Sequence, residues 1–119
     1  MGLRLLHLVA TSGSVLEVEP GDLVIERSAL GGFTGSDLEL VLRKAGMKDL
    51  LIAGFPGELG ADCTMREAND LGYECLLLTD CCSWLSDQTG AGAVSSVQMS
   101  GGIFGAVATS DDVLRTLES

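Results

Sequence analysis

The chain has 119 residues, 46% of them hydrophobic and 20% charged, and its formal net charge at pH 7 is −10. This length and hydrophobic content predict one globular domain with a modest core and exclude an intrinsically disordered chain. The acidic balance argues against binding to nucleic acid or to an anionic membrane, because no basic patch is available to neutralise phosphates.

The sequence also bears on compartment and cofactor. No apolar run reaches the ~20 residues of a membrane span, and Arg4 and His7 interrupt the first apolar stretch, so we predict a cytoplasmic protein without a secretory signal. His7 is the only histidine. The four cysteines are Cys63, Cys75, Cys81 and Cys82. They lack C-x-x-C spacing, which favours buried free thiols over a zinc site or a disulfide framework. We expect no metal and no cofactor.

The first elements are separated by glycine-rich turns. Residues 1–20 predict an irregular lead-in or a hairpin, and the Pro20-Gly21-Asp22 turn precedes a strand over residues 23–25. After a glycine-rich loop, Ser36 and Glu39 match a capping box that opens a helix. Gly46 ends this helix, whose predicted apolar face is Leu38, Val41, Leu42 and Ala45.

The central stretch predicts a strand, a tight turn, a helix and a second strand. Residues 50–53 form a short apolar run typical of a strand buried on both faces, and residues 54–57 form the turn. Helical spacing begins at Ala61, and Gly72 stands where a helix end favours a left-handed residue. The turn therefore lies at the carboxyl edge of a parallel sheet, where open α/β folds bind ligands.

The remainder predicts a loop over residues 81–92, a weak helix broken at Gly101 and Gly102, a strand over 103–109 and a helix capped by Ser110. Alternating strands and helices predict a single α/β domain over residues 1–119, with a mainly parallel sheet of four strands. Because so thin a sheet leaves an apolar edge or flank, we expect a homo-oligomer or association with another chain.

Three segments resemble the isochorismatase-like cysteine hydrolases, among them the amidohydrolases acting on biuret and ureidoacrylate. They are GDLVIERSALGGFTGSDLELVLRKAGMKDLLIAGF, CTMREANDLGYECLLLTDCC and GGIFGAVATSDDVLRTL. The likeness runs from about Gly21 to Leu117. It implies a three-layer α/β/α, Rossmann-like fold truncated at its N-terminus and a small amide or ureido ligand.

The resemblance also implies where the family's catalytic groups would fall. Its chemistry uses an aspartate, a lysine and a cysteine nucleophile at a helix N-terminus. The lysine position falls on Arg27 and the nucleophile position on Gly60, while the aspartate belongs to an N-terminal segment of two strands that the resemblance does not find here. Cys63, three residues after Gly60, is a substitute nucleophile or a small buried residue.

The resemblance implies that part of the binding site persists. The family's cis peptide falls on Phe55–Pro56, and proline lowers the cost of that bond. The backbone N–H groups of Leu59 and Gly60 are expected to point into the crevice, where they would face a developing oxyanion. The predicted ligand-binding residues are Phe33, Phe55, Pro56, Leu59 and Gly60.

Three hypotheses follow. The first is an inactive homologue that binds a ligand or assembles with a full-length hydrolase. The second is an active amidohydrolase that uses Cys63 or residues from a partner chain. The third is a remnant that folds only as a multimer and has no function of its own.

Overall fold

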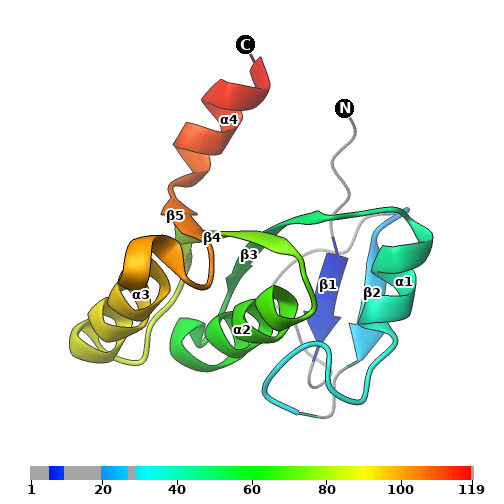
Figure 1. Cartoon of the computed structure of the whole chain (residues 1–119), viewed down its shortest axis with the longest axis horizontal. Helices are drawn as coiled ribbons and strands as arrows, with labels where there is room; N and C mark the ends of the chain where they lie inside the picture. Colours follow the sequence, from blue (N-terminus) through cyan, green and yellow to red (C-terminus); the bar gives the residue numbers. More distant parts are fainter. Residues whose placement is uncertain (1–5, 10–19, 27–28, 119) are drawn as a thin grey trace.

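The computed structural model describes residues 6–9, 20–26 and 29–118. No helix in these ranges is long and apolar enough to cross a membrane. Figure 1 shows the elements, which follow in the order β1 (Leu6–Val9), β2 (Leu23–Glu26), α1 (Leu38–Lys44), β3 (Asp49–Gly54), the π-helical turn η1 (Gly57–Ala61), α2 (Asp62–Asp70), β4 (Glu74–Cys82), α3 (Asp87–Gly102), β5 (Ala106–Ala108) and α4 (Ser110–Glu118).

All pairings between the described strands are parallel, as predicted, but they form two sheets and not one. β1 pairs with β2, and β4 pairs with β3 on one side and β5 on the other. The prediction of a single four-stranded sheet is wrong because β1 was not predicted as a separate strand and the two sheets do not join. The predicted hairpin would turn within residues 10–19, outside the described residues.

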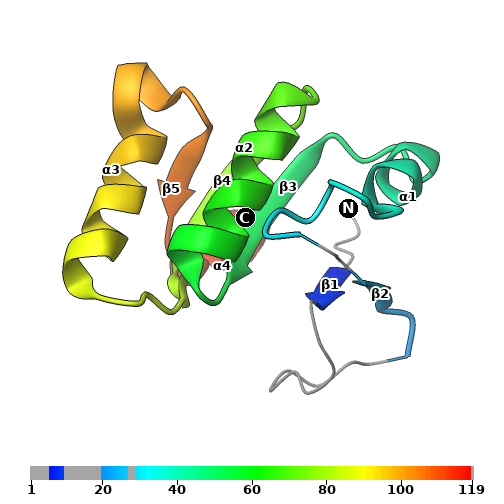
Figure 2. The same cartoon turned by 90° about the horizontal axis from the view of Figure 1, so that it is seen from below.

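The three-stranded sheet has one covered face and one open face. The covered face carries side chains from alternate positions that pack toward α2 and α3: Leu50, Ile52, Cys75, Leu77 and Val107. Figure 2 shows α2 in front of β4 and α3 beside β5. The open face carries the other alternate positions, Leu51, Leu76, Leu78 and Ala106. Leu51 is 42% exposed, whereas Leu77 is 1% exposed.

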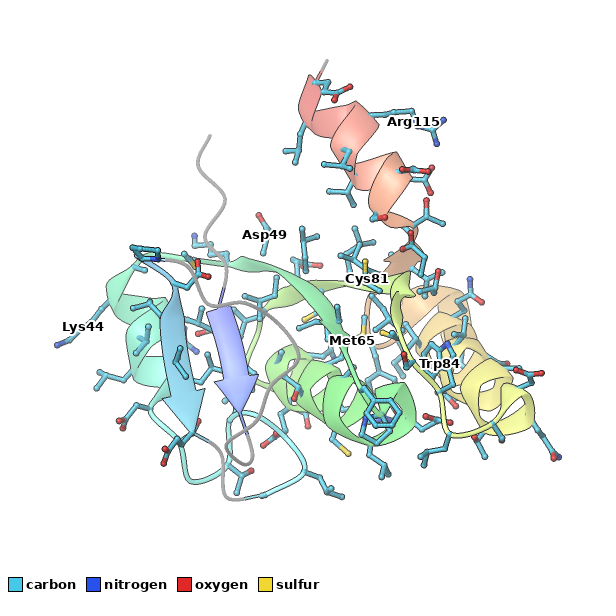
Figure 3. All side chains as sticks on the ribbon, turned by 180° about the vertical axis from the view of Figure 1, so that it is seen from behind. Lys44, Asp49, Met65, Cys81, Trp84 and Arg115 are labelled. Carbon is cyan, nitrogen blue, oxygen red and sulfur yellow. The ribbon has the colours of Figure 1, made fainter. Side chains whose placement is uncertain are left out.

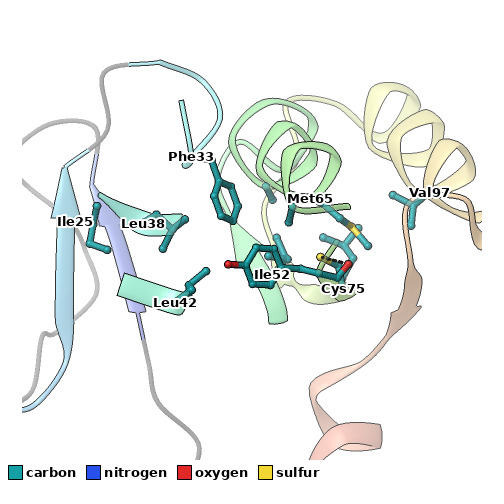
Figure 4. Packing of buried hydrophobic residues seen from close by; sticks show 12 residues of the cluster. Ile25, Phe33, Leu38, Leu42, Ile52, Met65, Cys75 and Val97 are labelled. Carbon is teal, nitrogen blue, oxygen red and sulfur yellow. Dashed lines mark hydrogen bonds between the residues drawn. The ribbon is translucent and has the colours of Figure 1, made fainter. Parts of the chain in front are cut away.

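The core is one cluster that extends under both sheets. Figure 4 shows Ile25, Leu38 and Leu42 on one side of it and Met65, Cys75 and Val97 on the other. Phe33 packs against Tyr73, with 5.7 Å between the ring centroids, and so connects the two parts. The burial of these side chains supplies the main favourable term in folding.

The helix ends differ from the predictions in two places and agree in one. Ser36 Oγ accepts a hydrogen bond from the Leu38 amide, but Glu39 pairs with Arg43, so the predicted capping box is wrong. The cap of α4 is formed by Thr109 and Asp112, whose backbone amides and side-chain oxygens bond reciprocally at 3.2 Å. Gly72 has a left-handed φ of 95° and confirms the predicted end of α2.

α3 begins earlier than predicted. Ser86 accepts a hydrogen bond from the Thr89 amide at 3.1 Å and caps a helix that starts at Asp87, within the stretch predicted as a loop. Gly90 and Gly92 have low helix propensity, and this is why the sequence pattern did not predict the first part of α3. The backbone leaves helical geometry at Met99, Ser100 and Gly101, which confirms the predicted break at Gly101.

α4 stands apart from the rest of the domain. In Figures 1 and 3 it projects from the end of β5, with Arg115 on its outer part. None of its described residues is buried, and Leu114 is 54% exposed. Its tether to the sheet is polar, because the Ser110 amide and hydroxyl both donate to the carboxylate of Asp80.

Candidate functional site

The predicted crevice lies where β3 and β4 end. Gly54 is paired with Cys82, the Ser83 amide donates to the Gly54 carbonyl at 3.3 Å, and the Gly57 amide donates to the Ser83 carbonyl at 2.8 Å. The carboxyl ends of the two strands are therefore joined to the first residue of η1. The peptide bond Phe55–Pro56 is cis, as the resemblance implied.

The amides of η1 are already used within the turn. Both the Leu59 and the Gly60 N–H donate to the carbonyl oxygen of Pro56, at 3.1 and 3.0 Å. The prediction that these two groups point freely into the crevice is therefore wrong. These are i→i+3 and i→i+4 bonds, so both amides are satisfied within the first turn of η1.

Gly60 is buried and linked to the glycine-rich loop through Thr64. The Thr64 hydroxyl donates to the Gly60 carbonyl at 2.7 Å and accepts from the Gly32 amide at 2.9 Å. One turn later on α2, Glu67 accepts from the amides of Phe33 and Thr34 and from the Thr34 hydroxyl. Together Thr64 and Glu67 hold residues 32–34 against α2.

Close backbone approach explains one glycine of this loop. A Cβ placed on Gly31 would lie 1.6 Å from Glu67 Oε1. Gly31 therefore leaves room for the carboxylate that holds the loop.

Glu58 links η1 to the start of α3. Its carboxylate accepts from the amides of Leu85 and Ser86 and from the Thr89 hydroxyl. Desolvation opposes ionisation, but the hydrogen bonds from Thr89, Leu85 and Ser86 outweigh it and lower the pKa of Glu58. These partners lie 27 to 31 residues away in the chain, so no local sequence pattern indicates the contact.

Trp84 occupies the space between η1 and α3. A Cβ on Gly57 would lie 2.5 Å from the indole, and a Cβ on Gly90 would lie 2.6 Å from it. Trp84 also borders a hollow of about 550 Å³ with Thr79, Val94 and Val107, between α3 and the sheet. This hollow is larger than one of about 330 Å³ between β2 and the start of α1.

The predicted ligand contacts differ in accessibility. Phe55 is 65% exposed and Leu59 37% exposed, and Pro56 lies between them in the chain. Phe33 is only 8% exposed and belongs to the core, so its ring offers little surface to a ligand. Arg27 lies outside the described residues, and its predicted role stays a prediction.

The cysteines divide into half-buried, buried and exposed thiols. Cys63 is half-buried on α2, three residues after Gly60. Burial, with the charge of Glu74, raises the pKa of Cys75 to about 11, and desolvation also raises the pKa of Cys81 and Cys82. Cys81 is exposed at the end of β4. Within the described residues, no group of three or more His, Cys, Asp or Glu side chains could hold a metal ion.

Asp62 is the buried acid of the site. One carboxylate oxygen accepts from Arg66 at 3.2 Å, and the other is buried with no partner among the described residues. Arg66 in turn lies over the ring of Phe104, 4.4 Å from its centroid. Through Arg66, the first turn of α2 is thus connected to Phe104, in the segment between α3 and β5.

Comparison with known proteins gives consistent matches. YwoC of Bacillus subtilis, an uncharacterized isochorismatase family protein, is 37% identical over 71 residues, covering 60% of this chain and 38% of YwoC. The ureidoacrylate amidohydrolase RutB of Variovorax paradoxus is 30% identical over 103 residues, covering 85% of this chain and 39% of RutB. The chain thus spans about two fifths of each of these relatives.

Solved structures agree. An isochorismatase family protein from Burkholderia thailandensis superposes with a TM-score of 0.78 at 32% identity, over 86% of this chain and 52% of that protein. A model of the isochorismatase domain matches residues 11–112. These matches confirm the resemblance found in the sequence and the predicted α/β fold. The chain belongs to the isochorismatase family of hydrolases.

Proposed function

We propose that this chain binds a small amide or ureido compound at the end of β3 and β4, and that residues 1–119 alone do not hydrolyse it. The observation that carries this proposal is the buried glycine at position 60. By family resemblance a nucleophile stands there, and a glycine has no side chain with which to attack a carbonyl.

The surface of η1 supports binding of a small, partly apolar molecule. Phe55 and Leu59 expose apolar surface beside the carboxyl ends of two parallel strands, the edge where α/β folds bind ligands. RutB, named as a ureidoacrylate amidohydrolase, supports the amide or ureido class.

A second candidate function is hydrolysis with Cys63 as a displaced nucleophile. The observation in its favour is that Cys63 is only half-buried and follows Gly60 by three residues. It requires compensation for the family's other catalytic groups, because removing members of an activated set commonly costs orders of magnitude in rate.

The two functions are separated by measuring binding and ammonia release with one panel of small amides, ureido acids and biuret. We expect saturable binding by calorimetry and no ammonia above the blank. Phe55→Ala should weaken binding about fivefold, a loss in the range expected for removing an exposed aromatic contact. Leu40→Ala, at an exposed position on α1, is the matched control and should leave binding unchanged.

Three results would overturn the proposal. Ammonia release that Cys63→Ala abolishes would establish the displaced nucleophile, and the absence of binding to every compound by folded protein would remove the ligand. Release that persists in Cys63→Ala, in repeated preparations, would show hydrolysis by a group other than Cys63 and equally contradict a non-hydrolytic chain.

A further inference from the structure

The hollow beside α3 has the size of a small-molecule site and lies apart from the exposed surface of η1. Its volume is about 550 Å³, within the range of roughly 300–1,000 Å³ typical of ligand pockets. Neither Phe55 nor Leu59 lines it. One wall is a single face of α3, because its residues recur at the three- and four-residue spacing of a helix: Asp87, Gly90, Ala91, Val94, Ser95 and Gln98.

The opposite wall is apolar and aromatic. It comes from β4, from β5, which lies beside α3 in Figure 2, and from the indole of Trp84. Val94 and Val107 are both half-buried there. Trp84 lies against α3 (Figure 3), since a Cβ on Gly90 would come within 2.6 Å of its ring. The Thr79 hydroxyl donates to the Ala108 carbonyl at 3.4 Å, so its hydrogen is used within the sheet. Such a surface suits the apolar part of a ligand.

Among the described residues that line the hollow, Asp87 carries the only charge. It is exposed, and the ion pairs between described residues join Arg43, Arg66 and Arg115 to other acids. A carboxylate beside an indole attracts an ammonium group, through ion pairing and through the electron-rich ring face. The net charge of −10 also raises the concentration of cations near the surface and opposes an anionic ligand.

The backbone amides at the start of α3 already have acceptors within the chain. The Ser86 hydroxyl accepts from the Thr89 amide, and Glu58 accepts from the amides of Leu85 and Ser86. These contacts satisfy donors that would otherwise favour an anion at this helix end. A metal ion is also disfavoured, because no group of three or more His, Cys, Asp or Glu side chains in the described part of the chain could hold one. The lining therefore favours an organic cation.

We propose that this hollow binds a small organic cation, a primary amine or quaternary ammonium compound that carries an aromatic or alkyl group. The ammonium group lies at Asp87 beside Trp84, and the apolar group lies between Val94 and Val107. This site is separate from the amide or ureido site proposed at η1 and does not depend on it.

The test titrates the chain with 2-phenylethylamine and, in parallel, with 2-phenylethanol, which has a hydroxyl group in place of the ammonium. We expect the amine to give a saturable change in Trp84 emission and chemical-shift changes at the methyl groups of Val94 and Val107. The alcohol should bind at least about fivefold more weakly, because it lacks the charge that Asp87 and the indole attract.

Two pairs of variants locate the charge and the cavity. Asp87→Asn should weaken amine binding at least about threefold, whereas Asp111→Asn changes the net charge equally, outside the hollow, and should leave binding unchanged. Ala91→Leu fills the hollow from an exposed helix position and should weaken binding at least about tenfold. Gln88→Leu, exposed on α3 but outside the lining, is its control. Circular dichroism confirms that each variant is folded before binding is measured.

Several results would overturn the proposal. These are the absence of saturable amine binding to folded protein, equal binding of the amine and the alcohol, or equal weakening by both members of either variant pair. Chemical-shift changes centred on Phe55 and Leu59 would place the amine at η1 and would also contradict it. Phe55→Ala should leave amine binding unchanged, so failure of this site is distinguishable from failure of the proposed function.

Discussion

The two faces of the β3–β4–β5 sheet are built from the same strands but have different surroundings. On the covered face, Met65 of α2 is fully buried and Leu77 is 1% exposed. On the open face, no described residue of α4 is buried, and Leu51 is 42% exposed. Both faces are rich in leucine, so hydrophobic composition alone does not distinguish them. What differs is whether a helix of this chain packs across the strands.

The largest expected effect comes from removing a leucine on the covered side. Leu77→Ala should lower the free energy of unfolding by about 3 kcal/mol, because it leaves a cavity in a packed core. Leu114→Ala on α4 should change it by less than about 0.5 kcal/mol, because its side chain is already exposed. Urea denaturation of both variants checks the comparison. Equal losses would mean that α4 is packed in solution.

A second pair of substitutions tests the packing of α3. Gly90→Ala places a methyl group against Trp84 and should destabilise by about 1–3 kcal/mol, as overpacking does. Gly92→Ala, two residues later, meets open space and should stabilise by about 0.5–1 kcal/mol through helix propensity. Thermal melting monitored at 222 nm measures both. A stabilising Gly90→Ala would show that the indole moves aside without cost.

Polar contacts on the covered side should contribute less than the core leucine. Glu67→Ala removes the acceptor for the amides of Phe33 and Thr34 and should cost about 1–2 kcal/mol. It should also speed hydrogen exchange at Thr34 while leaving Leu77 protected. Glu39→Ala, which loses only a surface pair with Arg43, is the control and should cost less than about 0.5 kcal/mol. Unchanged exchange at Thr34 would contradict a role in holding the loop.

The smallest effect is expected at the tether of α4, and it depends on pH. Hydrogen bonds from the Ser110 hydroxyl and amide lower the pKa of Asp80 from its ordinary value of 3.8. Because the folded pKa is lowered, the tether contributes fully above the unfolded pKa and is lost as pH falls through the folded pKa. Amide exchange in α4 should therefore rise below about pH 4, and Asp80→Asn should reduce that response. An unchanged pH response in Asp80→Asn would mean that another group titrates. One such group is Asp112, because hydrogen bonds from Thr109 also lower the pKa of its carboxyl group.

Local patterns in the sequence predicted the helices and strands better than they predicted how distant elements meet. The apolar spacing after Ala61 and the glycine at position 72 located α2, because both are properties of one helix. The split into two sheets depends on pairing between distant strands, which periodicity does not encode. Ser110 was predicted as a cap because serine favours that position, but its hydroxyl instead bonds Asp80, thirty residues away.

The candidate site shows the same limit. The family likeness placed a cis peptide at Phe55–Pro56, and the structure has it there. The links made by Glu58 and Glu67 were missed, because each glutamate reaches a segment about thirty residues away. A charged residue in a helical pattern is usually solvated, and nothing in its immediate neighbours marks it as an acceptor for a distant loop.

Trp84 is the only tryptophan in the chain, and it stands against backbone from both η1 and α3. Its emission is therefore an intrinsic optical signal for the separation of these two elements, free of background from other indoles. Excitation at 295 nm would follow the junction during refolding and on ligand addition, without a dye or a label. The glycines at positions 57 and 90 leave room for the indole ring between the two elements. The tryptophan emission of the wild-type chain therefore reports whether η1 and α3 are packed together.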